Sequence, residues 1–187
     1  MSQVKDPGWG PALKGAAFVL VPGLGARRMI RGTNALTVMR QLWITFVTAL
    51  LLIGVLVMVV NASLEGGGVD GRVVAGVVAA LGVISQLVGA NFLPAIAGRT
   101  KAEVQESAQK HFFLRVALAE PAALLGFLGF VLSANPAVYV LGAVVSLAGM
   151  LDARPSTRWL DRGQQQLRES GSEISLLGVL VQGGVTR

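Results

Sequence analysis

The chain has 187 residues, of which 53% are hydrophobic and 14% are charged, and its formal net charge is +6. A soluble domain of this length carries about 25% charged residues, so the composition excludes an ordinary soluble enzyme and indicates a membrane protein. The sequence has no cysteine, which excludes disulfides, thiolate metal ligands and a cysteine nucleophile.

Four long apolar runs predict four transmembrane helices. They are Trp43–Val60, Val73–Ala97, Phe112–Leu132 and Ala137–Leu151. Fifteen of the sixteen Lys and Arg residues lie on one side of these runs: before the first, between the second and third, at the start of the third (Arg115), or after the fourth. The exception is Arg72. Positive charge accumulates on the cytoplasmic side of membrane proteins. The sequence therefore predicts an all-α, multi-pass membrane protein with both termini in the cytoplasm. Its wealth of Ala, Val, Gly and Arg favours a bacterial plasma (inner) membrane.

Residues 1–42 form the first predicted region, a basic arm at the cytoplasmic surface. Its charges are expected to contact anionic lipids rather than nucleic acid. Within the arm, Arg27–Arg40 suits a short amphipathic helix, with Leu36 and Met39 facing lipid and Arg40 in the polar headgroup layer. The alternative is a solvated arm that only fixes the topology.

Residues 43–152 form the predicted four-helix bundle. The first helix is rich in Leu and Val, with Gly54 as its main gap, and suits a lipid-facing position. The second helix carries small and polar residues on one face: Ala75, Ala79, Gly82, Gln86 and Gly89. Small residues at this spacing let another helix approach closely. We therefore expect the second helix to be an interior helix, with Gly82 and Gly89 at its contacts.

A polar connection, Gly98–His111, is expected on the cytoplasmic side. Thr100 and Glu103 match a capping box at the start of a short helix over Lys101–Lys110. His111 is the only histidine, and without an identifiable partner it is interpreted as an interfacial side chain rather than a catalyst.

The third helix carries an acid, Glu120, followed directly by Pro121, and a patch of small residues, Gly126 and Gly129. The short link Ser133–Pro136 predicts a tight hairpin between the third and fourth helices. The fourth helix is expected to begin at Asn135 or Pro136 and to continue past Asp152. Tyr139 and Trp43 are expected as aromatic anchors at the outer and inner interfaces respectively.

Residues 153–187 form a predicted cytoplasmic tail. Ser156 or Thr157 can cap a helix over Arg158–Arg168. The apolar segment Ile174–Val181 is too short to span a membrane and suits an interfacial segment, a buried strand or a docking peptide. One alternative pairs it with Ala16–Val21 in a small β-structure.

Glu120 is the most informative side chain, because an ionised carboxylate at membrane depth costs several kcal/mol. It must be neutral, paired or facing water. Ser85, Gln86 and Asn91 on the second helix bracket a similar depth. The sequence therefore predicts a site in which Glu120 hydrogen-bonds one of these three, either as a polar tie between helices or as an ion site.

Part of the chain resembles the helical hairpin of the rotary ATP synthase ring subunit c. The resemblance covers Val73–Leu132, through the small-residue helix, the polar loop that starts Ala97–Arg99, and Val116–Glu120 on the return helix. It implies that Glu120 could bind a transported ion. The chain departs from that family in its sparse glycines and in Pro121. We therefore interpret the resemblance as a similar way of packing helices, not as membership of the family.

A second resemblance covers most of the chain. The basic arm before Trp43, the Ala119–Pro121 turn and the tail after Arg154 are similar to small actinobacterial four-helix membrane proteins, including the LucB-type accessory subunits of Mce lipid importers. The resemblance implies an accessory role in a lipid transporter, with other membrane subunits as partners.

Enzyme motifs are not evident: the sequence has no phosphate-binding glycine loop, no Ser/His/Asp set and no metal-ligand spacing. We therefore expect a non-catalytic accessory subunit of a membrane transport complex, with no metal or cofactor. The alternative functions are a small proton- or cation-translocating component that uses Glu120, and a lipid-binding or lipid-modifying activity.

Overall fold

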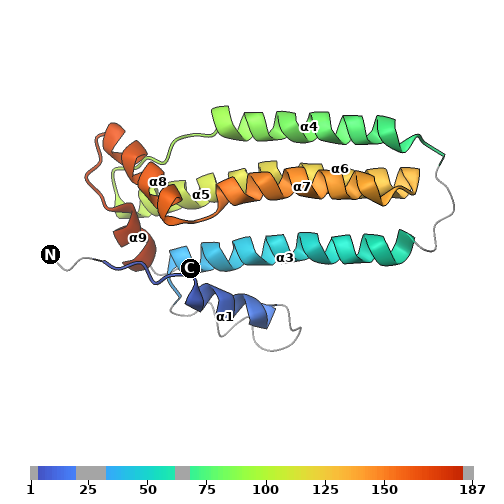
Figure 1. Ribbon diagram of the computed structural model, residues 1–187. Coiled ribbons are helices and arrows are strands. Elements are labelled where there is room, and N and C mark those ends of the chain that lie inside the picture. The colour runs from blue at the N-terminus through green and yellow to red at the C-terminus, as the bar shows by residue number, and fades with distance from the viewer. Residues whose placement is uncertain (1–3, 20–32, 62–67, 183–187) are drawn as a thin grey trace. The chain divides into compact units, whose positions relative to one another are not determined.

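The computed structural model describes residues 4–19, 33–61 and 68–182. Every element in these ranges is a helix (Figure 1). The helices are α1 (Gly10–Val19), α3 (Ala35–Asn61), α4 (Gly71–Asn91), α5 (Lys101–Ala119), α6 (Pro121–Ser133), α7 (Pro136–Ala153), α8 (Thr157–Glu169) and α9 (Leu176–Gln182). Four are long and apolar enough to cross a membrane: α3, α4, α5 with α6 as one run, and α7. The predicted all-helical fold with four such spans is confirmed for the described residues.

The first two spans differ from their predicted limits at the ends. Helix α3 begins eight residues before Trp43, because the side chain of Asn34 accepts a hydrogen bond from the Thr37 amide at 2.8 Å and caps the helix. Helix α4 ends at Asn91, where the Phe92 amide bonds the carbonyl of Val88. The remaining apolar residues before Gly98 are not helical.

The third span is one long helix with a break at Glu120, rather than a short helix followed by a separate span. The predicted cap is present, because the Glu103 amide donates to Thr100 Oγ1 at 3.3 Å and the Arg99 amide donates to the Glu103 carboxylate at 2.8 Å. No Gly or Pro then interrupts the chain before Pro121, so the helix continues past Lys110. Pro121 has no N–H to donate to the preceding turn, and α6 starts there.

The chain divides into two compact units. The bundle unit comprises Phe46–Leu93 and Leu114–Ala153. The terminal unit comprises the described residues of Met1–Thr45, Pro94–Phe113 and Arg154–Arg187. Helices α3 and α5 are continuous elements with residues in both units.

In the bundle unit, α6 and α7 form a closely packed hairpin, and α4 packs against both of them (Figure 1). Ala134 makes the turn in the left-handed region, at φ 50°, and Asn135 caps α7 by accepting from the Ala137 amide at 3.0 Å. The expectation that the second span is an interior helix is wrong. Val78, Gly82 and Gly89 are buried, but most apolar side chains of α4 are exposed, and α6 and α7 have the more buried positions.

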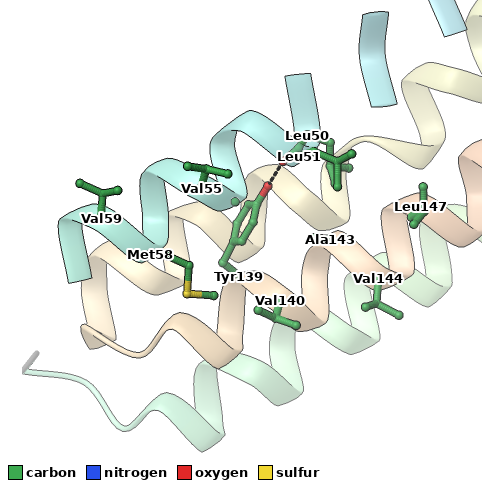
Figure 2. Close-up of a pocket in the computed structure, with 11 residues that line it drawn as sticks. Leu50, Leu51, Val55, Met58, Val59, Tyr139, Val140, Ala143, Val144 and Leu147 are labelled. Carbon is green, nitrogen blue, oxygen red and sulfur yellow. Dashed lines mark hydrogen bonds between the residues drawn. The ribbon is translucent and has the colours of Figure 1, made fainter. Parts of the chain in front are cut away.

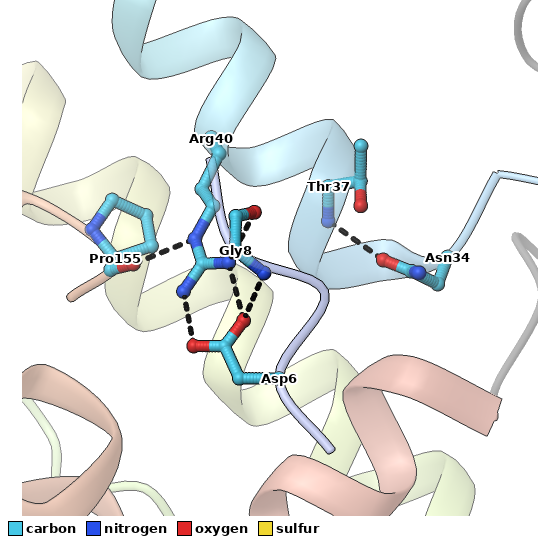
Figure 3. Close-up of polar contacts among 6 residues, drawn as sticks. All are labelled: Asp6, Gly8, Asn34, Thr37, Arg40 and Pro155. Atoms are coloured by element: carbon cyan, nitrogen blue, oxygen red, sulfur yellow. Dashed lines mark hydrogen bonds and ion pairs between the residues drawn. The ribbon is translucent and has the colours of Figure 1, made fainter. Parts of the chain in front are cut away.

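The terminal unit is organised around Arg40, whose side chain is 1% exposed. Its guanidinium donates to both carboxylate oxygens of Asp6, at 2.6 and 2.8 Å, and to the carbonyls of Gly8 and Pro155, at 2.8 and 3.0 Å (Figure 3). The guanidinium lowers the pKa of the Asp6 carboxyl below its ordinary value, mainly through the side-chain hydrogen bond. The N-terminal arm and the tail after α7 are thus held together by one side chain.

This arrangement corrects the expected amphipathic helix at the headgroups. Residues 27–32 lie outside the described residues, whereas Ala35–Arg40 belong to α3. Leu36 and Met39 are buried in the protein instead of facing lipid, and Arg40 is buried instead of lying in the polar layer. The polar partner that permits this burial, Asp6, lies 34 residues earlier in the chain.

Tryptophan and arginine side chains stack beside this ion pair. The rings of Trp9 and Trp43 meet edge to face, with centroids 5.6 Å apart. The Arg154 guanidinium lies 4.6 Å from the Trp9 centroid and 5.8 Å from that of Trp43. Such cation–π contacts add about 0.5–1 kcal/mol each at exposed sites, so Trp43 has a protein partner in addition to any interfacial role.

The loop before α5 and the tail helices complete the terminal unit. The Ile96 amide donates to Gln166 on α8 at 3.0 Å, and His111 Nδ1 lies 2.9 Å from the carbonyl oxygen of Pro94. The predicted tail helix is present as α8, capped by Ser156. The alternative β-pair is wrong for the described residues, because Ala16–Val19 lie in α1 and Leu176–Val181 lie in α9. Residues 20 and 21 lie outside the described ranges.

Candidate functional site

Glu120 lies at the break between α5 and α6 and lines a cavity in the bundle unit. The cavity has a volume of about 310 Å³, within the range of small-molecule sites. Its walls come from α3, α6 and α7 together with Glu120: Phe46, Ala49, Leu50, Ile53, Leu56, Ala123, Leu124, Phe127, Tyr139, Ser146 and Met150. Almost all of these side chains are apolar, so the carboxyl stands at the edge of a hydrocarbon-lined space.

Ser146 contributes a second polar group to this cavity. Its side chain is fully buried, at 0% exposure, and its Oγ has no hydrogen-bond partner. A hydroxyl in the middle of a helix can bond its own backbone four residues earlier, yet Ser146 does not do so. A buried polar group without a partner costs about 1–3 kcal/mol, which marks this position as one that a ligand or water could satisfy.

Tyr139 closes one wall of the cavity and connects α7 to α3. Its hydroxyl donates to the carbonyl of Leu50 at 2.6 Å (Figure 2). The ring is buried and approaches Gly54, where an added Cβ would lie 3.3 Å from Tyr139 Cε1. Tyr139 therefore packs within the bundle unit, and its role as an aromatic anchor at the outer interface stays a prediction. The gap that Gly54 leaves in the first span is the place where this ring packs.

A second, larger groove lies against the same tyrosine. It has a volume of about 580 Å³ and is lined by apolar side chains of α3 and α7 (Figure 2). Leu50 and Tyr139 line both spaces. Helix α3 therefore touches α7 at a few positions, with hollow apolar space next to the Tyr139–Leu50 contact.

None of the expected partners on α4 bonds Glu120. Ser85 Oγ donates to the Leu118 carbonyl at 2.7 Å, in the last turn of α5 before Pro121 interrupts the helix. Asn91 donates to the carbonyl of Leu87 on its own helix at 2.8 Å. Gln86 lies against Gly149 of α7, and its Nε2 is buried without a partner. The structure thus does not bring the predicted Glu120–amide site together.

The four glycines of the predicted packing set lie at helix contacts of the bundle unit. A Cβ at Gly82 would come within 2.9 Å of Ala122 and Val145, and one at Gly129 within 2.6 Å of Val74. At Gly126 it would meet the backbone of α7 at 3.1 Å, whereas at Gly89 it would only reach ordinary contact with Leu118, at 3.4 Å.

Sequence reasoning missed the matching stripe on α7. Gly142 packs on the backbone of Ala122 and Gly126, and Gly149 packs on Gln86. Gly142, Ser146 and Gly149 are spaced by four and three residues, the same signal that identified the small face of the second span. A search of the fourth span for this spacing would have found both the packing glycines and the cavity serine.

An ion pair between α5 and α7 was also missed. Arg115 pairs with Asp152, and their side chains are 21% and 51% exposed respectively. Neither residue has a distinctive motif, and only the fold brings the two helices together. Among the described residues, no group of three or more His, Cys, Asp or Glu side chains could hold a metal ion.

Replacing Tyr139 with phenylalanine tests the contact between α3 and α7. The variant keeps the ring but loses the hydrogen bond to Leu50, so the free energy of unfolding should fall by about 0.5–1.5 kcal/mol. Titration with denaturing detergent, followed by circular dichroism, measures this change. A variant as stable as the wild type would mean that the hydroxyl bond does not stabilise the bundle unit.

No family model, no curated protein and no solved structure matches this chain.

Proposed function

We propose that this protein is a non-catalytic accessory subunit of a larger membrane transport complex. It crosses a bacterial plasma membrane four times, with both termini in the cytoplasm. Other membrane subunits are its partners, and its basic arm contacts anionic lipids. Lipid import is the transport process that we favour, because the cavity and the groove beside α3 are lined almost entirely by apolar side chains.

The proposed topology is supported by one observation. Hydrogen bonds within the terminal unit join the three segments that are predicted to be cytoplasmic. Arg40 of the arm bonds Pro155 of the tail, and Ile96 of the connection before α5 bonds Gln166 of α8. Segments that share hydrogen bonds must lie on the same side of a membrane. With the positive-inside rule, these bonds support a cytoplasmic location for all three segments.

Cysteine labelling tests this topology directly, since the chain has no cysteine of its own. Single cysteines at the exposed positions Ala102 and Gln165 should react with an impermeant maleimide only after the cells are permeabilised. A cysteine at Val69, which is 45% exposed, should react in intact cells. Labelling of Ala102→Cys from outside would contradict both the four-span topology and the shared side of the terminal unit.

The accessory role is supported by the apolar surfaces of α3 and α4. Leu51, Val55 and Val59 on α3 are 58–66% exposed, and α4 presents a similar row of Val and Leu side chains. Apolar helix surfaces of this kind are covered by lipid or by the helices of a partner subunit. The protein should therefore co-purify with stoichiometric membrane partners in mild detergent and should show no ion flux when reconstituted alone.

A small proton- or cation-translocating component is the second candidate. It is supported by Glu120 and Ser146, which both line one cavity of the bundle unit. The Ser146 hydroxyl has no hydrogen-bond partner there. The two functions differ in their response to Glu120→Gln, which keeps the shape of the side chain but cannot exchange a proton. An accessory subunit should keep the assembly and activity of its complex in this variant. A complex that assembles normally but is inactive would favour translocation instead.

A further inference from the structure

The cavity between α3, α6 and α7 combines a hydrocarbon lining with two polar groups. The Tyr139 hydroxyl, which also lies at this cavity, already donates a hydrogen bond to the carbonyl of Leu50. The structure gives neither the Glu120 side chain nor Ser146 Oγ a hydrogen bond, and Ser146 is completely buried. Such a space selects a ligand that is mostly apolar and carries one hydrogen-bonding group.

We propose that this cavity binds a long-chain alcohol, a neutral lipid with an apolar chain and a single hydroxyl. A hydroxyl both donates and accepts, so it can donate to the Glu120 carboxyl and accept from Ser146 Oγ. The chain lies along Leu124, Phe127 and Ile53, whose side chains line the cavity. This inference does not depend on the accessory role, because a ligand site of this kind needs no partner subunit.

The chemistry of the walls favours a neutral ligand over a charged one. Burying a charged group in a hydrocarbon-lined space is costly unless it is paired, and an anionic headgroup would find no Lys or Arg among the residues that line the cavity. A neutral hydroxyl avoids this cost and satisfies the serine that the fold leaves without a partner. An amine could instead pair with Glu120 as a cation, and the experiment below distinguishes this outcome.

Photo-crosslinking of the purified full-length protein in phosphatidylcholine nanodiscs tests the proposal. The probe is hexadecanol with a diazirine near its hydroxyl, and mass spectrometry locates the adducts. Adducts should map to the polar end of the cavity: Phe46–Leu50 on α3, Glu120–Ala123, and Ser146–Met150 on α7. Unlabelled hexadecanol should compete at least fivefold better than its methyl ether, which cannot donate a hydrogen bond. Equal competition by the ether would overturn the proposal, and so would stronger competition by hexadecylamine, which would indicate a cation site.

Two tryptophan substitutions on α3 provide a matched pair. Ala49 lines the cavity and has an exposed side chain, so Ala49→Trp fills the space without disturbing the core. Leu52 is 56% exposed and lines neither space, so Leu52→Trp adds the same side chain elsewhere on the helix. Labelling should fall at least tenfold in Ala49→Trp and stay unchanged in Leu52→Trp. Equal labelling in both variants would overturn the proposed site.

The polar groups are tested in the same assay. Ser146→Ala removes one hydrogen bond to the ligand, which is equivalent to about fivefold weaker competition by hexadecanol. The methyl ether keeps an oxygen that accepts from Ser146 Oγ, so Ser146→Ala should weaken its competition by a similar factor. If Ser146→Ala left competition by hexadecanol unchanged, the hydroxyl would not be bound at this serine and the proposal would fail.

Discussion

Replacing Arg40 with methionine is expected to destabilise the terminal unit by about 3 kcal/mol. Breaking a buried ion pair by removing one partner typically costs about 3–5 kcal/mol, and the lower value applies because the Asp6 side chain is 25% exposed. The variant also leaves the carbonyls of Gly8 and Pro155 without their donor. The three tryptophans, Trp9, Trp43 and Trp159, all belong to the terminal unit, so tryptophan fluorescence during denaturation measures this change.

The matched control for this prediction is Arg158→Met. Arg158 is exposed on α8, and the same substitution there should change the free energy of unfolding by less than about 0.5 kcal/mol. If both variants lost the same stability, the network around Arg40 would not hold the terminal unit together.

The same ion pair gives the terminal unit a dependence on pH. The folded-state pKa of Asp6 is lowered by Arg40, so its contribution is present above the unfolded pKa of about 3.9. This contribution is lost as the pH falls below that value and through the folded pKa. In Asp6→Asn, fluorescence-detected stability should lose this dependence on acid. An unchanged acid dependence in Asp6→Asn would show that another carboxyl is responsible.

The four spans could be predicted from sequence because their signal is local. Hydrophobic runs and the distribution of basic residues can be recognised along the chain, and this requires no knowledge of the tertiary contacts. The hairpin at Ser133–Pro136 follows in the same way from loop length. The break at Glu120 was not among the predictions, although Pro121 is a local signal for it. The predicted limits were less accurate where caps decide them, as at Asn34, whose side chain starts α3 before the apolar run begins.

The terminal unit could not be predicted because its contacts join distant segments. In the sequence, Arg40 does not differ from the other basic residues that fix the topology. No neighbouring residue in the chain identifies Asp6 or Pro155 as its partner. The same limit applies to the candidate site. Glu120 could be singled out by the cost of a carboxyl at membrane depth, but its neighbours depend on which face of α5 and α6 meets α3. In the structure, Glu120 and Ser146 both line a cavity with residues of α3, α6 and α7, and no hydrogen bond joins Glu120 to α4.

Adding one methyl group at Gly142 is expected to disrupt a close backbone contact between α6 and α7 in the bundle unit. A Cβ there would overlap the carbonyl oxygen of Ala122 and come within 3.0 Å of the Gly126 Cα. These are backbone atoms of α6, which cannot rotate away as a side chain can, so α6 and α7 must separate. Forced overpacking typically costs about 1–3 kcal/mol, and Gly142→Ala should lower the free energy of unfolding by this amount in a denaturing-detergent titration followed by circular dichroism.

Gly76→Ala is the matched control, and the two variants are expected to differ in sign. Gly76 lies on α4 with nothing within 4 Å of an added Cβ. Alanine is favoured over glycine in a helix interior by about 1 kcal/mol, so this variant should be as stable as the wild type or more so. Because both changes are glycine to alanine within a candidate span, helix propensity and hydrophobicity change equally. Only the contact with α6 differs, so a Gly142→Ala protein as stable as Gly76→Ala would contradict the close α6–α7 packing that forms the wall of the Glu120 cavity.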